Sequence, residues 1–246
     1  MASHRKRTRR PVQLPLPLPG LAREPGAKKR GRKPGKRGFV RHRMRGPHAA
    51  AHPVHVVLRS RFRPLRSQFV FATVRQALAA ATRARPGFRI TQFSVQHDHL
   101  HLIVEASGKT ELSRGMQGLA IRIARQVNRL LFRRGKLWAD RFFSRALNSP
   151  RAVKHALGYV LNNFRKHGKP SLRIDPYSSA PFFDGFRELR GNPAWDLPPT
   201  PGLPLTPLGV PPPHFSDELP IRAARTWLGR IGWRRSGLIS LSHTHA

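Results

Sequence analysis

The chain has 246 residues and a formal net charge of +36, from 47 Lys and Arg against 11 Asp and Glu. This excess favours a polyanionic partner; we expect nucleic acid rather than an acidic membrane, because no long basic helix carries a bulky aromatic face. The absence of cysteine excludes disulfides, thiolate zinc sites and cysteine nucleophiles.

Two further classes are disfavoured by the distribution of residues. No apolar run approaches the roughly 20 residues that a membrane-spanning helix needs. A metal site built only from carboxylates needs a cluster of acids. The acids between residues 51 and 150 are Asp98, Glu105, Glu111 and Asp140.

Residues 1–50 carry 16 Lys and Arg and one acid, Glu24, with Pro and Gly throughout. This composition predicts a disordered basic arm, because it offers little apolar surface to bury. A solvated tail is one interpretation. An arm that follows DNA phosphates is the other. We favour it because closely spaced positive charges repel one another and are stabilised most by binding to phosphate.

Residues 51–190 form the predicted folded domain. Residues 54–59 read as a strand, and Ser67 to Arg85 as a helix that Pro86-Gly87 ends. Phe88 to Gln96 and Leu100 to Ala106 read as a hairpin with its turn at His97-Asp98. A long helix is expected from a Thr110 cap to about Arg134, then a strand within residues 137–147.

Ser149 and Pro150 have the pattern of an N-cap followed by the first helical residue, so a helix is expected from there to Gly168. The order strand, helix, strand, strand, helix, strand, helix predicts an α+β fold. We expect a ferredoxin-like sandwich with an antiparallel sheet and helices on one face.

Residues 191–246 read as a Pro-rich linker followed by a short helix. The helix is expected from Ser216 to about Gly229, with Trp227 and Trp233 as docking groups. No internal repeats are found.

His99 and His101 flank Leu100 in a predicted strand. Alternate side chains of a strand share a face, so the two imidazoles point the same way while Leu100 points into the core. Such a pair is half of a divalent-metal site, and His97 would join it if the strand began earlier. Two surface histidines on a strand are the other interpretation of this short motif.

Tyr159 lies off the apolar stripe of the helix that begins at Pro150. At about 100° per residue, it falls roughly 130° from the centre of that stripe. Asn163 lies one turn further on nearly the same face, which His155 and Lys166 share. An exposed tyrosine on a solvated helix is the plainer interpretation of the position taken alone.

Taken together, these pieces resemble the single-tyrosine HUH transposases, and most closely the REP-associated tyrosine transposases. The resemblance rests on His99-Leu100-His101, on the segment YVLNN that holds Tyr159 and Asn163, and on the segments HPVHVVLRS, FRITQFSVQHDHLHLIVEA and LWADRFFSRAL. It covers about residues 52–190. The chain departs from many relatives after Asn163, where Phe164 replaces a proline.

The resemblance implies a mechanism. His99 and His101 would hold Mg²⁺ or Mn²⁺, with Asn163 as an oxygen ligand. Tyr159 would attack the scissile phosphate of single-stranded or hairpin DNA and form a 5′-phosphotyrosine bond. Lys166 or the metal would stabilise the phenolate. The resemblance is compatible with a monomer or a homodimer, and with action at the bacterial nucleoid in the cytoplasm.

A second face of the long helix carries arginines at a spacing typical of phosphate contacts. Its members are Arg122, Arg125, Arg129 and Arg133. A solvated helix face is the equally common alternative. Aromatic residues such as Trp138, Phe142 and Phe143 are candidates for stacking on bases, although core packing suits most of them better.

Three other functions compete with a DNA-cleaving enzyme. The first is a catalytically silent DNA-binding protein on the same fold. The second is a cupin-like metalloenzyme, because His99, His101 and Glu105 match an H-x-H-x₃-E pattern, although long helices surround it. The third is an architectural nucleic-acid packer, which would need the positive charge but neither the histidine pair nor Tyr159.

Overall fold

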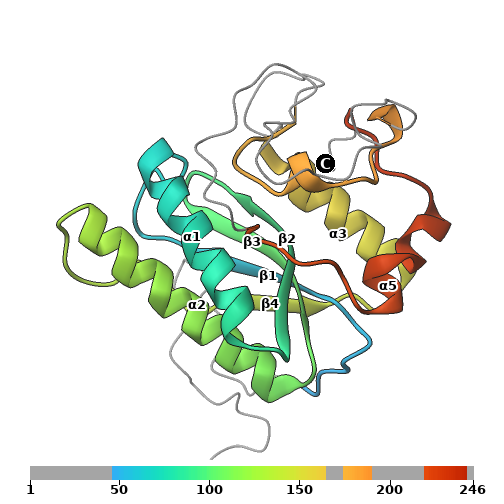
Figure 1. The fold of residues 1–246 in the computed structure, drawn as a ribbon, viewed down its shortest axis with the longest axis horizontal. Helices are drawn as coiled ribbons and strands as arrows, with labels where there is room; N and C mark the ends of the chain where they lie inside the picture. Colours follow the sequence, from blue (N-terminus) through green and yellow to red (C-terminus); the bar gives the residue numbers. More distant parts are fainter. Residues whose placement is uncertain (1–45, 165–173, 190–218, 243–246) are drawn as a thin grey trace, which may run out of the picture. The chain divides into compact units, whose positions relative to one another are not determined.

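The computed structural model describes residues 46–164, 174–189 and 219–242. Nearly all of the expected basic arm and all of the Pro-rich linker lie outside these ranges. Figure 1 shows the arrangement of the elements. In chain order they are β1 (Val54–Arg59), α1 (Gln68–Ala84), β2 (Phe88–Val95), β3 (His99–Ala106), α2 (Lys109–Leu130), β4 (Phe143–Ala146), α3 (Pro150–Asn162), η2 (Ala180–Phe182), η3 (Arg187–Leu189), α5 (Trp227–Arg230) and η4 (Gly232–Ser236).

The four strands form one sheet in the order β2-β3-β1-β4, and each neighbouring pair is antiparallel. The two helices that connect the strands, α1 and α2, lie together on one face (Figure 1). This order and connectivity are those of a ferredoxin-like sandwich, so the α+β prediction is confirmed.

The main hydrophobic core lies between the sheet and the two connecting helices. Val54, Val56 and Leu58 of β1 are at most 2% exposed, and they alternate with residues that face the other way. The apolar stripes of α1 and α2 cover this face. Gly115 allows α2 to approach closely, because a Cβ there would lie 2.3 Å from Cγ of Phe88.

A β-bulge in β2 resets which side chains face the core. The pairing with β3 shifts between Ile90 and Gln92, and Thr91 is the extra residue. Phe93 is therefore buried in the main core beyond the bulge, while Ser94 lies opposite His101 on the other face of the sheet. The bulge thus places a small side chain beside the histidine pair.

The second face of the sheet is covered by α3 and by residues 219–242, here called the C-terminal segment. A second apolar cluster joins Val153, Leu157 and Leu161 of α3 to Ile103 of β3 and to Trp233. Trp233 is 2% exposed and docks the C-terminal segment as expected. Trp227, the other expected docking group, is 49% exposed.

The helix expected from Ser216 to about Gly229 is much shorter in the described part of the chain. Residues 219–226 are not helical, and α5 comprises only Trp227–Arg230. Pro220 disfavours helical backbone at the residue before it. Thr226 then begins the short helix by accepting a hydrogen bond from the Gly229 N–H at 3.0 Å.

Three other expected boundaries differ. Gly108, not Thr110, is the N-cap of α2, and the helix ends at Leu130. The strand expected within residues 137–147 is confined to β4, with one isolated bridge between Ser60 and Trp138 before it. Helix α3 ends at Asn162, whereas the predicted end at Gly168 lies outside the described residues. None of the helices in the described ranges has the length and apolar character needed to cross a bilayer.

Candidate functional site

The histidine pair lies at the start of β3, on the sheet face that α3 covers. Leu100 between them is 1% exposed and belongs to the main core, as strand alternation requires. The rings of His99 and His101 are nearly perpendicular, with centroids 4.6 Å apart. His101 is 3% exposed, while the His99 side chain is 24% exposed. The pair therefore has one buried and one accessible imidazole.

Asp98 orients the accessible imidazole. Its Oδ1 lies 2.7 Å from Nδ1 of His99, and its Oδ2 accepts a hydrogen bond from Arg63 at 2.7 Å. Burial opposes ionisation of Asp98, but the hydrogen bond and charge of His99, together with Arg63, outweigh it and hold its pKa below the usual value. The ionised carboxylate thus engages Nδ1 of His99, leaving Nε2 as the atom to face a metal.

His55 of β1 contacts the buried imidazole of His101, and it was not among the residues predicted from the sequence. Its Nε2 lies 3.2 Å from Nδ1 of His101, and the two rings are stacked with centroids 5.3 Å apart. Burial, and secondarily the charge of Arg145, lower the pKa of His55 to about 4. His55 is therefore neutral at pH 7. The missed signal was its outward-facing position in the VHVVLR strand.

Tyr159 reaches the same cluster from α3. Its ring is edge-on to His101 with centroids 5.2 Å apart, and its centroid is 5.8 Å from that of His55. Ser149 accepts a hydrogen bond from the Ala152 N–H at 3.2 Å and Pro150 follows, so the predicted cap begins the helix. Tyr159 is half-buried at the border of the second apolar cluster.

Asn163 is the residue immediately after α3. It is 3% exposed, and its Nδ2 has no hydrogen-bond partner among the described residues. An unpaired buried N–H donor carries a free-energy cost, which a hydrogen-bond acceptor would relieve. Lys166, the expected partner of the phenolate, lies outside the described residues.

The chain is similar to a known protein family over the residues that form this cluster. Residues 49–163 match the family model described as "Transposase IS200 like", and this range includes both histidines, Tyr159 and Asn163. Over residues 49–163 the chain is therefore similar to the IS200-like transposases.

One solved structure similar to the chain is that of a REP-associated tyrosine transposase bound to a REP hairpin. The identity is 21% and the TM-score 0.47, with 57% of this chain and 82% of that chain covered. No curated protein sequence matches significantly.

The arginines expected to bind DNA lie on α2 or follow its end, on the side of the sheet opposite the histidines. Arg122, Arg125 and Arg129 are exposed on α2, whose apolar stripe covers the sheet face opposite the histidines. Arg133 follows the end of α2, with its guanidinium carbon 5.1 Å from the ring centroid of Phe62. The structure therefore does not bring these arginines together with His99 and Tyr159.

Glu105 has a structural role in the fold. It is 5% exposed and accepts hydrogen bonds from the Arg225 N–H at 2.7 Å and from the N–H and hydroxyl of Thr226 at 3.1 and 2.7 Å. Its oxygens bind the C-terminal segment. Together with the α+β fold, these bonds remove the cupin-like alternative.

The C-terminal segment also contacts the helix that carries the tyrosine. The Asn162 amide donates to the Ser240 carbonyl at 2.9 Å, and Lys154 Nζ donates to the Ser236 carbonyl. Trp233 packs in the second apolar cluster together with residues of the same helix. The C-terminal segment thus contacts α3 near both of its ends, and α3 also packs against the sheet through Ile103.

Within the described ranges, no group of three or more His, Cys, Asp or Glu side chains is arranged to hold a metal. His55 faces Nδ1 of His101, which leaves His99 and His101 as the two candidate imidazole ligands, so a divalent ion at this cluster needs a ligand of another type. A buried amide such as Asn163 is suitable, because an amide oxygen suits Mg²⁺ and Mn²⁺.

Proposed function

We propose that this protein cleaves single-stranded or hairpin DNA and transfers the strand through a 5′-phosphotyrosine on Tyr159, in a reaction that requires Mg²⁺ or Mn²⁺. The observation that carries the proposal is the cluster of His99, His101 and Tyr159 rings on one sheet face. The IS200-like family match supports it. We take residues 51–190 as the catalytic domain.

His99 and His101 would bind the metal through Nε2, and Asn163 would add its amide oxygen. The residues fit this role, because the neighbours Asp98 and His55 engage the Nδ1 atoms of the two imidazoles. Imidazole is softer than the ligands that Mg²⁺ prefers, so Mn²⁺ should serve at least as well. The bound metal would polarise the scissile phosphate and offset the charge that grows on its oxygens.

In the proposed cleavage step, the phenol oxygen of Tyr159 attacks phosphorus. A bond forms between that oxygen and phosphorus, and the bond from phosphorus to the 3′ oxygen breaks. The phenol loses its proton and the departing oxygen gains one, which leaves a free 3′-OH. In strand transfer, a 3′-OH attacks the phosphotyrosine and releases Tyr159. The covalent bond conserves the cleaved linkage, so no ATP is needed.

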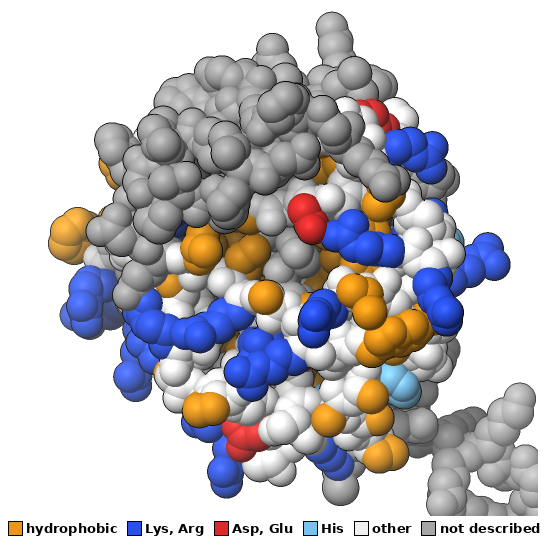
Figure 2. Space-filling model, turned by 45° about the vertical axis from the view of Figure 1, so that its right-hand side comes forward, with side chains coloured by type: hydrophobic (Ala, Val, Ile, Leu, Met, Phe, Trp, Pro, Cys, Tyr) orange, Lys and Arg blue, Asp and Glu red, His pale blue; other side chains and the backbone are white. Residues whose placement is uncertain are grey.

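The charge of the chain suits a DNA partner. Basic side chains far outnumber acidic ones on the face drawn in Figure 2. Because α2 lies on the side of the sheet away from the histidines, we assign Arg122, Arg125 and Arg129 to contacts with DNA beyond the cleaved strand. Arg133, Lys166 and the basic arm over residues 1–50 would add phosphate contacts.

One chain supplies both the histidines and Tyr159, so the proposal needs no second subunit and is equally compatible with a homodimer. No membrane partner is proposed. The substrate would place the protein at the nucleoid, in the cytoplasm.

The test is incubation with labelled oligonucleotides and Mn²⁺, followed by a denaturing gel. The proposal predicts a protein–DNA adduct that chelation of the metal prevents and that Tyr159→Phe abolishes while DNA binding persists. A protein that binds these oligonucleotides but forms no adduct with any of them is the catalytically silent alternative.

A further inference from the structure

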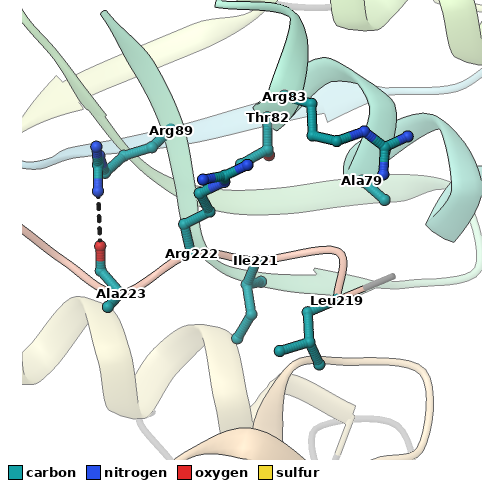
Figure 3. A pocket seen from close by; sticks show the side chains of 8 residues that line it. All are labelled: Ala79, Thr82, Arg83, Arg89, Leu219, Ile221, Arg222 and Ala223. Atoms are coloured by element: carbon teal, nitrogen blue, oxygen red, sulfur yellow. Dashed lines mark hydrogen bonds between the residues drawn. The ribbon is translucent and has the colours of Figure 1, made fainter. Parts of the chain in front are cut away.

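An open pocket of about 590 Å³ lies at the β2 edge of the sheet, away from the histidine cluster. Its walls come from the end of α1, from the start of β2 and from residues 219–223 (Figure 3). Three of its lining residues are arginines, namely Arg83, Arg89 and Arg222, and none is acidic. The lining includes no aromatic side chain on which a base would stack.

The C-terminal segment is fastened along β2 to complete this pocket. The Arg222 N–H donates to the Ile90 carbonyl at 2.8 Å, and Nη1 of Arg89 donates to the Ala223 carbonyl at 3.0 Å. Arg222 extends into the space between this segment and α1, where Arg83 also lies (Figure 3). The pocket is therefore built by hydrogen bonds between parts of the chain that are far apart in the sequence.

The positive charge around Arg89 exceeds the negative charge near it. Burial lowers the pKa of Arg89, the charges of Arg225 and Arg222 lower it further, and Glu105 alone acts in the opposite direction. Glu105 lies 4.0 Å from Nε of Arg89 and already accepts three hydrogen bonds from Arg225 and Thr226. The charges of Arg89, Arg222 and Arg225 thus act near a single carboxylate, and this excess of positive charge favours binding of an anion.

The pocket and the histidine cluster lie along the same strands. Arg89 is directly opposite Glu105 in the sheet, and Glu105 shares its face with His101, four residues earlier on β3. Four residues of strand span about 13 Å. In duplex DNA each strand carries one phosphate per about 3.4 Å of helix axis. The distance between the two sites is therefore short enough for a few nucleotides to span.

We propose that this pocket binds backbone phosphates of the DNA next to the cleaved bond. The inference rests on the proposed function, and it adds that the C-terminal segment is part of the DNA-binding surface. A phosphate chain fits better than a single nucleotide, because the pocket is open, lacks an aromatic stacking surface and lies in line with the cluster. Guanidinium groups bind phosphate through paired hydrogen bonds.

The test compares two double variants of the full chain, each also carrying Tyr159→Phe so that no cleavage occurs. Arg83→Ala with Arg222→Ala removes two exposed pocket arginines. Arg122→Ala with Arg125→Ala removes the same charge from α2, on the other layer. Affinity for a labelled single strand of about ten nucleotides is measured by fluorescence anisotropy across a salt series. Equal melting temperatures of the two variants establish that both are folded.

The proposal predicts at least a tenfold loss of affinity for the pocket variant, and a salt slope smaller by about 1 for each arginine removed. The α2 variant should keep the affinity and slope of its Tyr159→Phe parent on this short strand. Arg222→Lys, which keeps the charge, should keep the slope. A folded pocket variant with unchanged affinity and slope would overturn the proposal. The adduct assay remains a separate readout, so each proposal can fail without the other.

Discussion

The ring of Tyr159 lies edge-on to the ring of His101, with 5.2 Å between centroids and 88° between planes. The two residues come from a helix and a strand that meet only in the folded chain. His55 contacts His101, Asn163 follows the last residue of α3, and the C-terminal segment packs behind that helix. Each of these features gives a prediction.

His55→Ala should weaken Mn²⁺ binding about 10- to 100-fold, because it removes the side chain that holds the Nδ1 side of His101. Isothermal titration calorimetry with Mn²⁺ and no DNA measures this directly. His155→Ala is the matched control, since His155 is an exposed histidine of α3. Equal affinities of folded His55→Ala and wild type would remove His55 from the site.

Asn163→Ala should also lower Mn²⁺ affinity, because it removes the proposed oxygen ligand. Asn163→Asp should restore or raise the affinity, since a carboxylate oxygen is a stronger ligand for a hard cation. The same titration serves both variants. If alanine and aspartate at this position bind Mn²⁺ as tightly as asparagine, the third ligand is another group.

Glu105→Ala should destabilise the protein by about 3 kcal/mol, because it leaves the donors of Arg225 and Thr226 without their buried acceptor. Chemical denaturation gives the free energy of unfolding. Glu111→Ala is the control. Its ion pair with Arg85 is longer, at 3.7 Å, and more exposed, so its loss should cost less than about 1 kcal/mol. Similar losses for the two variants would contradict the anchoring role of Glu105.

Glu188 should make the docking of the C-terminal segment depend on pH. Burial opposes its ionisation, but hydrogen bonds from Ser240 and the Leu241 N–H hold its pKa below the usual value. A depressed carboxyl pKa contributes stability that is complete above the unfolded pKa and is lost as the pH falls through the folded one.

Wild type should therefore melt above Glu188→Gln at pH 7, and the difference should vanish toward pH 3. Melting curves followed by tryptophan fluorescence at several pH values provide the comparison. A difference between the two proteins that persists unchanged at pH 3 would contradict the electrostatic origin of this docking.

The parts of the fold that local patterns determine were predictable from the sequence. Alternation places Leu100 in the core and the flanking histidines on the other face, and Ser149-Pro150 begins α3. The order of elements was enough to predict the ferredoxin-like arrangement, because short connections and antiparallel pairing leave few topologies.

The features that depend on packing between distant segments were not predictable. The role of His55 follows from the pairing of β1 with β3, which sets Val57 opposite His101 and brings His55 within reach. The bulge at Thr91 moves Ser94 to the site face. The role of Glu105 is visible only once the C-terminal segment is docked against it. The position of Arg122, on the side of the sheet away from the histidines, can be predicted only if one knows which face α2 covers.

In the proposed reaction, Tyr159 becomes covalently attached to the 5′ side of a cleaved DNA strand. Mass spectrometry of a protease digest, after incubation with single-stranded DNA and Mn²⁺, tests this attachment most directly. We expect a nucleotide linked to the α3 peptide that contains Tyr159, and no linked peptide from Tyr159→Phe. A nucleotide linked to any other residue, or an adduct that survives in Tyr159→Phe, would contradict it.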